Sequence, residues 1–196
     1  EKRGRVLGGS SSINAMIFHR GNRRDFDGWA AMGLKGWGWD GVLPYFKKME
    51  SFAEGPNDMR GGNGPLKIVR APAAHRLFDV FMRSGEQAGY QRPADHNRGD
   101  QDGMHIAQMT VDNGVRCSAS RAYLRPVFNR PNLTLRMHAH VCRVLFKGDT
   151  AIGVELVSGK KLYAQKEVLI ASGSVGAAKL LLLSGVGPAD ELRSLE

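Results

Sequence analysis

The chain has 196 residues, 42% hydrophobic and 24% charged, so it can form one large domain or parts of two and is too apolar for a disordered protein. Its net charge is +9, but the basic residues are dispersed, and the densest group, Arg20–Arg24, is followed at once by Asp25 and Asp27. We therefore expect a solvated basic surface and no nucleic-acid partner, although such a field also suits an anionic cofactor.

The cysteines, apolar runs and histidines argue against a structural disulfide, a membrane-spanning segment and a metal site. Cys117 and Cys142 form no CxxC pair, which favours a reducing, cytoplasmic compartment, and the longest apolar run, Leu180–Leu183, is too short to span a bilayer. No signal peptide is visible, and the opening on Glu1 suggests the middle of a longer sequence. No HxxxH or HExxH spacing occurs, so we expect structural roles and no metal site for His19, His75, His96, His105, His138 and His140.

The first zone, residues 1–54, combines a glycine- and serine-rich turn with three predicted helices. The first helix is expected around Ser11–Ile17 and the second near Asp25–Met32, with Asp25 as its N-cap. The third is expected over Asp40–Ser51, where apolar residues recur at helical spacing.

The second zone, residues 55–130, begins with a polar, glycine-rich loop of a kind that often forms a lid or linker. The loop leads into a predicted strand, Leu66–Val69. An amphipathic helix is expected over His75–Gly89, stopped by its last glycine. Beyond it, Met104–Val111 is a candidate strand and Ser118–Val127 a short helix.

The third zone, residues 131–196, has the clearest pattern. After a predicted strand at Leu133–Met137, two short turns separate three strands of a meander: Val141–Phe146, Ala151–Leu156 and Lys161–Ala164. The apolar run Glu167–Ala171 is typical of a buried parallel strand. A glycine turn and a helix from about Val175 to Leu183 follow, and this order makes half of a dinucleotide-binding unit.

The most distinctive motif is Gly4–Met16 (GRVLGGSSSINAM). Gly8 and Gly9 remove side chains where a backbone must pass close to a large ligand, the three serines are expected to point hydroxyls into one space, and Asn14 can donate and accept. From these residues alone, a helix-capping turn and a cofactor site are about equally supported. The GxSxG elbow is absent, no catalytic triad can be argued, and Gly185–Pro188 is only a helix stop.

Together these segments resemble the glucose–methanol–choline (GMC) oxidoreductase family, in particular its choline dehydrogenase-like and alcohol dehydrogenase members. The resemblance begins with GRVLGGSSSINAMIFHRGNRRDFDGWAAMGLKGWGWDGVLPYFKKME. It continues, in the family's order, with GNGPLKI, RCSASRAYLRPVFNRPNLTL, HVCRVLFKGDTAIGVEL and KEVLIASGSVGAAKLLLLSGVGP, and so covers essentially the whole chain.

The resemblance implies a mixed α/β fold with an incomplete Rossmann-like FAD-binding domain and part of an antiparallel-sheet substrate domain. Residues 1–54 would belong to the FAD-binding domain. Residues 55–130 would form the lid loop and part of the substrate-binding domain, and residues 131–196 would return to the FAD-binding domain.

The resemblance also implies which residues contact FAD. Val141 would meet the adenine end through its main chain, and Ser172 and Gly173 would lie near the nucleotide. Some relatives attach the flavin covalently to a histidine at the position of Ile13, and because isoleucine cannot form that bond, the FAD is expected to be noncovalent. The remaining contacts, mostly through backbone, would be Gly4, Gly8, Gly9, Ser10, Asn14, Ala15, Met16 and Ile17.

The implied reaction is hydride transfer from a primary alcohol (choline, aliphatic or aromatic) to flavin N5, which gives the aldehyde. A quinone or another acceptor would take the electrons, and peripheral association of the parent enzyme with the inner membrane is an open alternative. The family's GxGxxG motif and catalytic histidine would lie before Glu1 and after Glu196, so the chain alone is expected to be inactive and to hold FAD poorly. A hydroxynitrile lyase of the same family and an inert truncated module are the alternatives.

Overall fold

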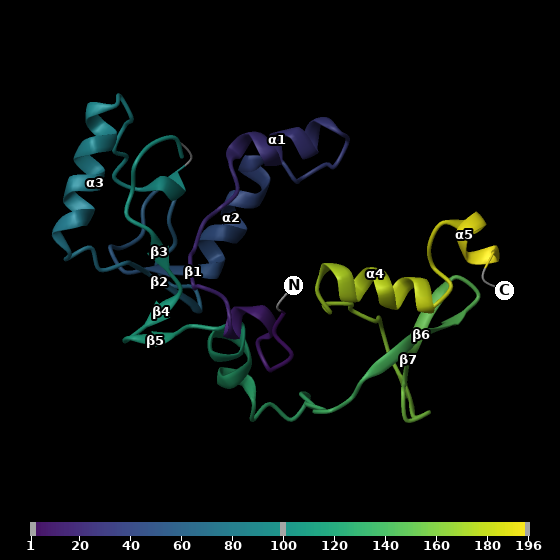
Figure 1. Cartoon of the computed structure of the whole chain (residues 1–196). Helices are drawn as coiled ribbons and strands as arrows, with labels where there is room; N and C mark the ends of the chain where they lie inside the picture. Colours follow the sequence, from purple (N-terminus) through teal and green to yellow (C-terminus); the bar gives the residue numbers. More distant parts are fainter. Residues whose placement is uncertain (1–2, 99–100, 195–196) are drawn as a thin grey trace. The chain divides into compact units, whose positions relative to one another are not determined.

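The computed structural model describes residues 3–98 and 101–194, so the outer ends of the first and third zones, residues 1–2 and 195–196, lie outside it. The chain forms two compact units, Glu1–Leu133 and Thr134–Glu196 (Figure 1). Helices and small sheets occur in both units, and the predicted mixed α/β class is confirmed. Within the described residues, no helix is long and apolar enough to cross a membrane.

The first unit opens with two helices, α1 (Arg23–Ala31) and α2 (Trp39–Met49), close to the ranges predicted. The predicted cap of α1 is wrong, because Asn22 and not Asp25 occupies the N-cap. Asn22 and Asp25 form a reciprocal capping box, in which the Asn22 N–H donates to Asp25 Oδ2 at 3.2 Å. The helix therefore begins about one turn earlier than the sequence indicates.

Aromatic rings join α1 to α2. The Phe26 ring centroid lies 5.3 Å from that of Trp29 and 5.7 Å from those of Trp39 and Phe46. The rings meet edge to face or tilted, the arrangement that aromatic pairs prefer. Trp39 is almost fully buried, so this cluster fixes the angle between the two helices.

A three-stranded sheet follows, in the order β1 (Glu50–Phe52), β2 (Leu66–Arg70) and β3 (Gln108–Met109). β1 pairs with β2 in parallel and β2 pairs with β3 in antiparallel fashion. The predicted strand Met104–Val111 is thus half loop: only Gln108 and Met109 enter this sheet, and Val111 begins the next strand. The sheet and its neighbours bury a small apolar core made of Phe18, Met49, Phe52, Leu66 and Ile68.

The strands β4 (Val111–Asp112) and β5 (Val115–Arg116) form a hairpin beyond β3. Its turn residues, Asn113 and Gly114, have φ of 49° and 76°. Asparagine and glycine tolerate this left-handed conformation, so Asn-Gly is favoured in two-residue hairpin turns. A π-helical turn, Ser120–Leu124, and a 3₁₀ turn then supply the helical structure predicted near Ser118–Val127.

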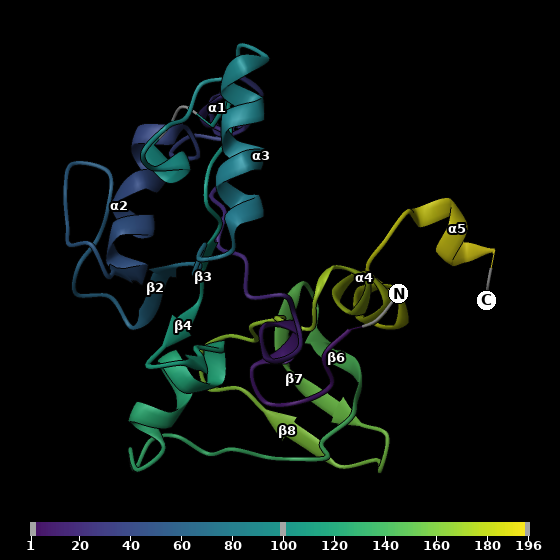
Figure 2. The ribbon, with the colours of Figure 1, turned by 60° about the vertical axis from the view of Figure 1, so that its left-hand side comes forward.

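The helix α3 (Arg76–Gln87) confirms the predicted amphipathic helix and stands apart from α2 (Figures 1 and 2). His75 is its N-cap, and His75 Nδ1 accepts from the Leu77 N–H at 3.2 Å. A Cβ on Gly85 would lie 2.3 Å from Met104 Cγ, so only glycine lets that side chain pack on the helix. Most of the apolar face is exposed, and only Met82 of its large side chains is buried.

The second unit contains the predicted meander, with β6 (Val141–Lys147), β7 (Thr150–Leu156) and β8 (Lys161–Tyr163) paired in that order (Figure 2). Both pairings are antiparallel. The strand predicted at Leu133–Met137 is wrong, because none of the described residues pairs with that segment.

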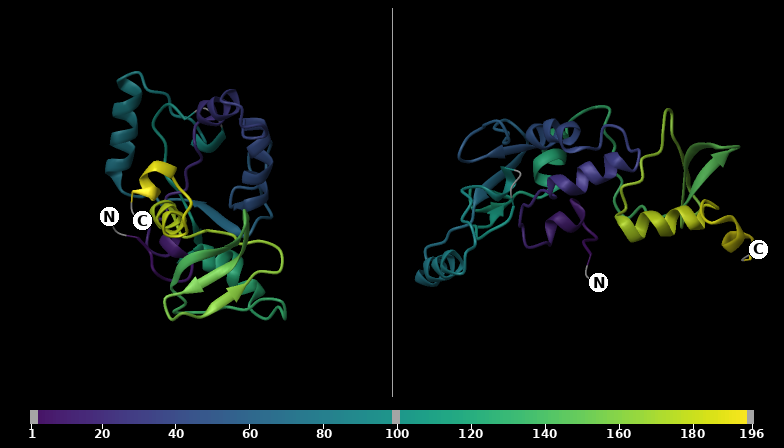
Figure 3. Two further views of the ribbon diagram at one scale, coloured as in Figure 1. Left: turned by 90° about the vertical axis from the view of Figure 1, so that its right-hand side faces the viewer. Right: turned by 90° about the horizontal axis from the view of Figure 1, so that it is seen from above.

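The helix α4 (Ser174–Leu183) contacts β6 and crosses it at an angle (Figure 3), and α5 (Ala189–Arg193) follows Pro188. Ser184 Oγ accepts from the Val144 N–H at 2.8 Å and ties the end of α4 to the sheet. The strand predicted at Glu167–Ala171 is also wrong: it has no ladder partner among the described residues, and Leu169 is 82% exposed. A buried parallel strand exists only where neighbouring strands cover it.

Candidate functional site

The glycine–serine segment, Gly4–Ile17, folds as a tight turn and not as the predicted helix over Ser11–Ile17. Its only helical part is a 3₁₀ turn, Gly9–Ser12, preceded by Gly8 with φ of 88°. The chain then leaves the turn and reaches an isolated bridge between Ile17 and Met109. The helix does not form because two left-handed glycines and competing serine hydrogen bonds interrupt it.

Two of its glycines are required by close backbone approach. A Cβ on Gly4 would lie 2.3 Å from the Gly9 carbonyl oxygen, and one on Gly8 would lie 2.6 Å from Ser12 Oγ and 3.1 Å from the Ser120 nitrogen. A Cβ on Gly9, in contrast, would meet nothing within 4 Å, although φ is 54° there. Gly4 and Gly8 therefore shape the turn, whereas Gly9 leaves its outer surface open.

The serine hydroxyls do not gather in one space, and that expectation is wrong. Ser12 Oγ donates to the Leu7 carbonyl at 2.8 Å, and Ser11 Oγ donates to the Gly8 carbonyl. Ser10 Oγ accepts from the Gly4 N–H at 3.2 Å. The serines thus stabilise the turn from within.

Asn14 is held by an arginine that sequence reasoning missed. Arg116 Nη1 donates to Asn14 Oδ1 at 2.8 Å, to the Asn14 carbonyl at 2.7 Å and to the Ser11 carbonyl at 3.2 Å. Asn14 Oδ1 also accepts from the Met16 N–H at 3.0 Å, and Met16 has φ of 63°. Within residues 3–98 and 101–194, the Asn14 NH₂ group donates no hydrogen bond. No local pattern could have revealed Arg116, because its partners lie at the other end of the first unit.

The outer surface of the segment presents large apolar side chains beside the exposed Arg5 and Ser10. Val6, Ile13 and Ile17 are each more than half exposed, although Phe18, the next residue, is buried in the core. Together with the exposed Asn14 and Ala15, this surface offers apolar side chains and one unpaired amide donor. Small-molecule sites commonly combine these two kinds of group.

In the second unit, the predicted contacts lie at two places. Val141 opens β6 opposite Leu156, directly before a register shift in the ladder. Gly173 is the N-cap of α4, with φ of 78°, and Ser172 precedes it. A Cβ added to Gly173 would have no described atom within 4 Å. None of the described side chains caps α4, so its first N–H groups are available to an anion.

A buried charged network supports the first unit, and sequence reasoning missed it entirely. Glu50 and Arg60 are fully buried, and Arg60 Nε donates to Glu50 Oε1 at 2.8 Å. Arg20 Nη2 donates to the same oxygen at 2.8 Å, and Arg60 Nη1 donates to Asp95 Oδ2 at 2.8 Å. Two cations thus meet two anions, and the charges balance. The prediction of a solvated Arg20–Arg24 group is wrong at its first residue, because Arg20 is only 1% exposed.

Amides complete this network. Gln108 Nε2 donates to Asp95 Oδ1 at 2.7 Å, while Gln108 Oε1 accepts from Arg60 and Asn97. Burial tends to raise the pKa of Asp95, but the bonds from Arg60, the Asn97 N–H and Gln108 outweigh it and hold that pKa below its ordinary value of 3.8. Asn97 Oδ1 in turn accepts from the Arg20 N–H at 2.8 Å. The network therefore anchors the chain directly after the glycine–serine segment.

Three histidines that were assigned separate structural roles lie together. They are His19, His96 and His105, and local spacing could not detect the group because the three residues come from separate segments.

The fold is similar to those of two solved structures, an FAD-dependent oxidoreductase and a pyridoxine 4-oxidase. An FAD-dependent oxidoreductase from Chaetomium thermophilum superposes with a TM-score of 0.91 at 32% identity, over 98% of this chain and 36% of that one. Pyridoxine 4-oxidase from Mesorbium loti gives a TM-score of 0.89 at 32% identity, over 97% of this chain and 38% of that one.

The family model described as GMC oxidoreductase matches residues 2–193, and the chain belongs to this family. The chain is 43% identical over 194 residues to the oxygen-dependent choline dehydrogenase of Brucella anthropi, covering 97% of this chain and 35% of that protein. It is 44% identical over 197 residues to the mitochondrial choline dehydrogenase of Mus musculus, covering 99% of this chain and 33% of that protein. The chain thus spans about a third of the length of these curated relatives.

Proposed function

We propose that this chain supplies part of the FAD-binding region of an oxidoreductase that converts a primary alcohol of the choline type into its aldehyde. The observation that carries the proposal is the glycine–serine segment, which folds on itself through Gly4 and Gly8 and leaves large apolar side chains and the Asn14 amide exposed. The 43–46% identity to choline dehydrogenases supports the choice of substrate class.

The residues present fit a flavin dinucleotide. A Cβ at Gly9 or Gly173 would meet open space, so both glycines allow a bulky ligand to approach the backbone. The uncapped N-terminus of α4, behind Gly173, suits a phosphate group. The Asn14 NH₂ is a donor for a carbonyl oxygen or a ring nitrogen of an isoalloxazine ring. Ala15, Met16 and Ile17 would then contact the ring, mostly through backbone.

We infer that FAD is held noncovalently. Ile13 stands where some relatives have a flavin-linked histidine, and its hydrocarbon side chain offers no atom that can form such a bond. Ile13 is about half exposed, so it can still pack against the ring.

When bound, FAD supplies the hydride acceptor, its N5 atom, for oxidation of the alcohol carbon. The residues described position the cofactor: Arg116 fixes the Asn14 amide, and the buried network anchors the chain behind it. No group among the predicted contacts is a general base, so we assign none of them a catalytic role. A quinone or another acceptor for the electrons, and a cytoplasmic location, complete the proposal.

The amide of Asn14 can be tested without disturbing its supports. Asn14→Asp keeps the oxygen that accepts from Arg116 and Met16 but removes the NH₂ donor. In the protein encoded by the whole reading frame that contains this chain, we expect weaker FAD retention and a changed flavin absorption spectrum. The matched control, Asn132→Asp in an exposed turn, should change neither. Equal flavin content and identical spectra in both variants would contradict the role of Asn14.

A hydroxynitrile lyase of the same family would retain FAD without net redox chemistry. Alcohol-dependent reduction of a dye by the same protein separates the two functions. Dye reduction supports the dehydrogenase, whereas a flavin-loaded protein that reduces no dye with choline or other primary alcohols favours the lyase.

A further inference from the structure

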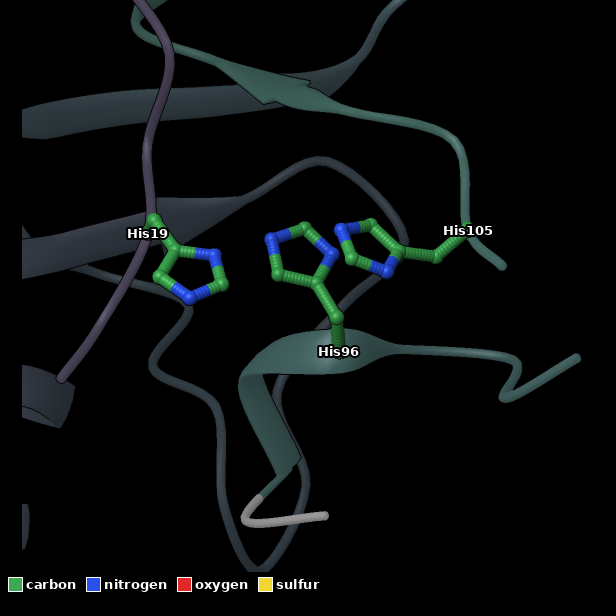
Figure 4. Close-up of side chains that lie close together, drawn as sticks. All are labelled: His19, His96 and His105. Carbon is green, nitrogen blue, oxygen red and sulfur yellow. The ribbon is translucent and has the colours of Figure 1, made fainter. Parts of the chain in front are cut away.

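Three histidine rings lie side by side in the first unit (Figure 4). His19 follows the glycine–serine segment, His96 opens the 3₁₀ turn His96–Arg98, and His105 lies in the loop before β3. One ring nitrogen of each histidine lies within 4.8 Å of the other two. Figure 4 shows the three side chains pointing toward one another, with His96 between the others.

Two nitrogens of this cluster are buried and have no hydrogen-bond partner among residues 3–98 and 101–194. They are His96 Nδ1 and His105 Nδ1, and His96 is only 1% exposed. A buried polar atom without a partner costs free energy, and native structures hold few of them. A positively charged ligand at these lone pairs removes that cost.

The hydrogen bonds of His96 define which nitrogen carries the lone pair. Nε2 lies 3.4 Å from the Phe18 carbonyl oxygen. Asn97 Nδ2 lies 3.2 Å from the same nitrogen but already donates to Gln108 Oε1 at 2.8 Å and to the Phe18 carbonyl at 3.3 Å. We therefore assign the proton to Nε2, which donates to Phe18 and leaves the lone pair on Nδ1. A backbone acceptor on the second nitrogen is the usual companion of a metal-ligating histidine.

We propose that His19, His96 and His105 together bind one divalent transition-metal ion of the Zn²⁺, Ni²⁺ or Cu²⁺ type. Imidazole ligands suit these ions, whereas Mg²⁺ and Ca²⁺ require oxygen ligands. His19 is exposed, so a water molecule can take the fourth position on its side. The ion fastens the chain after the glycine–serine segment to the turn that begins at His96 and to the loop that carries His105.

Coordination requires a modest rearrangement of the rings. The ring centroids of His96 and His105 lie 3.9 Å apart at 21°, and those of His19 and His96 lie 5.0 Å apart at 14°, so the rings stack. The lone pairs lie in the ring planes, so the rings of His19 and His105 must turn about χ2. The nitrogens, now within 4.8 Å of one another, must approach by up to about 1.5 Å to reach Zn–N distances of about 2.0–2.1 Å. His19, at the surface, has room to turn.

The test is Zn²⁺ binding to the whole, tag-free chain, measured by isothermal titration and by metal analysis after dialysis. We expect one Zn²⁺ per chain, and the addition of Co²⁺ should give the visible absorption of a nitrogen-ligated ion. His19→Gln changes an exposed residue and should weaken binding at least about tenfold, since even loss of a supporting partner costs 10–100-fold. His105→Gln should do the same. The matched control is His140→Gln in the exposed chain before β6.

Three results would overturn the proposal. The first is a wild-type chain that binds no Zn²⁺, which would leave the cluster as stacked neutral rings. The second is equal binding by wild type and by folded His19→Gln, checked by circular dichroism. The third is a loss in His140→Gln as large as in His19→Gln, which would indicate adventitious surface binding.

Discussion

Replacing Glu50 by alanine should destabilise the first unit more than any exposed ion-pair substitution. The Glu50 carboxylate is fully buried and accepts four hydrogen bonds: one from Arg20, two from Arg60 and one from the Gly61 N–H. Its removal leaves two buried guanidinium groups facing one carboxylate, Asp95. Breaking a buried ion pair from one side costs about 3–5 kcal/mol, because a charge is left without compensation.

The matched control is Glu54→Ala. Glu54 pairs with Arg70, and the Nε–Oε1 distance of 2.7 Å is as short as any in the buried network. Both partners are partly exposed, however, so the expected loss is only about 0–1 kcal/mol. Glu50→Gln removes the charge but keeps the shape of the side chain. We expect its loss in the free energy of unfolding to be most of the loss caused by Glu50→Ala.

The assay is urea unfolding followed by tryptophan fluorescence, because all three tryptophans lie in the first unit. The difference between the two alanine variants should be at least about 2 kcal/mol in the free energy of unfolding. Equal losses for Glu50→Ala and Glu54→Ala would refute the conclusion that burial sets the importance of this network.

Further predictions concern pH, backbone conformation and the arginine that holds the segment. The pKa of His96 is about 4 in the folded protein, below its ordinary value of 6.5, so between these pH values the unfolded chain binds a proton that the folded chain does not. The free energy of unfolding should therefore be highest above about pH 6.5 and about 2 kcal/mol lower at pH 5. Urea unfolding at several pH values should show a different pH dependence for wild type and for His96→Leu. Gly8→Ala should lower the free energy of unfolding by about 2 kcal/mol or more, and Gly9→Ala by about 1 kcal/mol. Both residues have positive φ, but only at Gly8 would a Cβ meet neighbouring atoms. Thermal unfolding that shows the larger loss for Gly9→Ala would contradict this. Arg116→Ala should speed proteolytic cleavage of the glycine–serine segment, whereas exposed Arg130→Ala should not.

The sequence predicts those elements whose determinants all lie within a short stretch of the chain. The meander β6–β8 is joined by tight glycine turns, and α3 carries its own cap and stop, so each pattern is complete within a short window. The apolar run Glu167–Ala171 was predicted as a strand for the same local reason, but a strand also needs partners. No described residue supplies one, and the run has no ladder.

Features that depend on distant partners could not be predicted. Arg20 and Glu50 are charged, and charged residues are almost always solvated unless paired, so their burial follows only from meeting Arg60 and Asp95. The predicted helix after Gly9 failed because serine hydroxyls bond to the backbone of the turn. In the glycine–serine segment, the sequence predicts ligand contacts, but not that Arg116 donates a hydrogen bond to Asn14.

The proposed flavin role is tested most directly by anaerobic mixing of the protein encoded by the whole reading frame with choline or another primary alcohol. We predict bound FAD that loses its visible absorbance as the alcohol is oxidised, and that is released into the supernatant by acid precipitation because it is noncovalent. A purified protein without flavin, or with flavin that no primary alcohol reduces, would contradict the account.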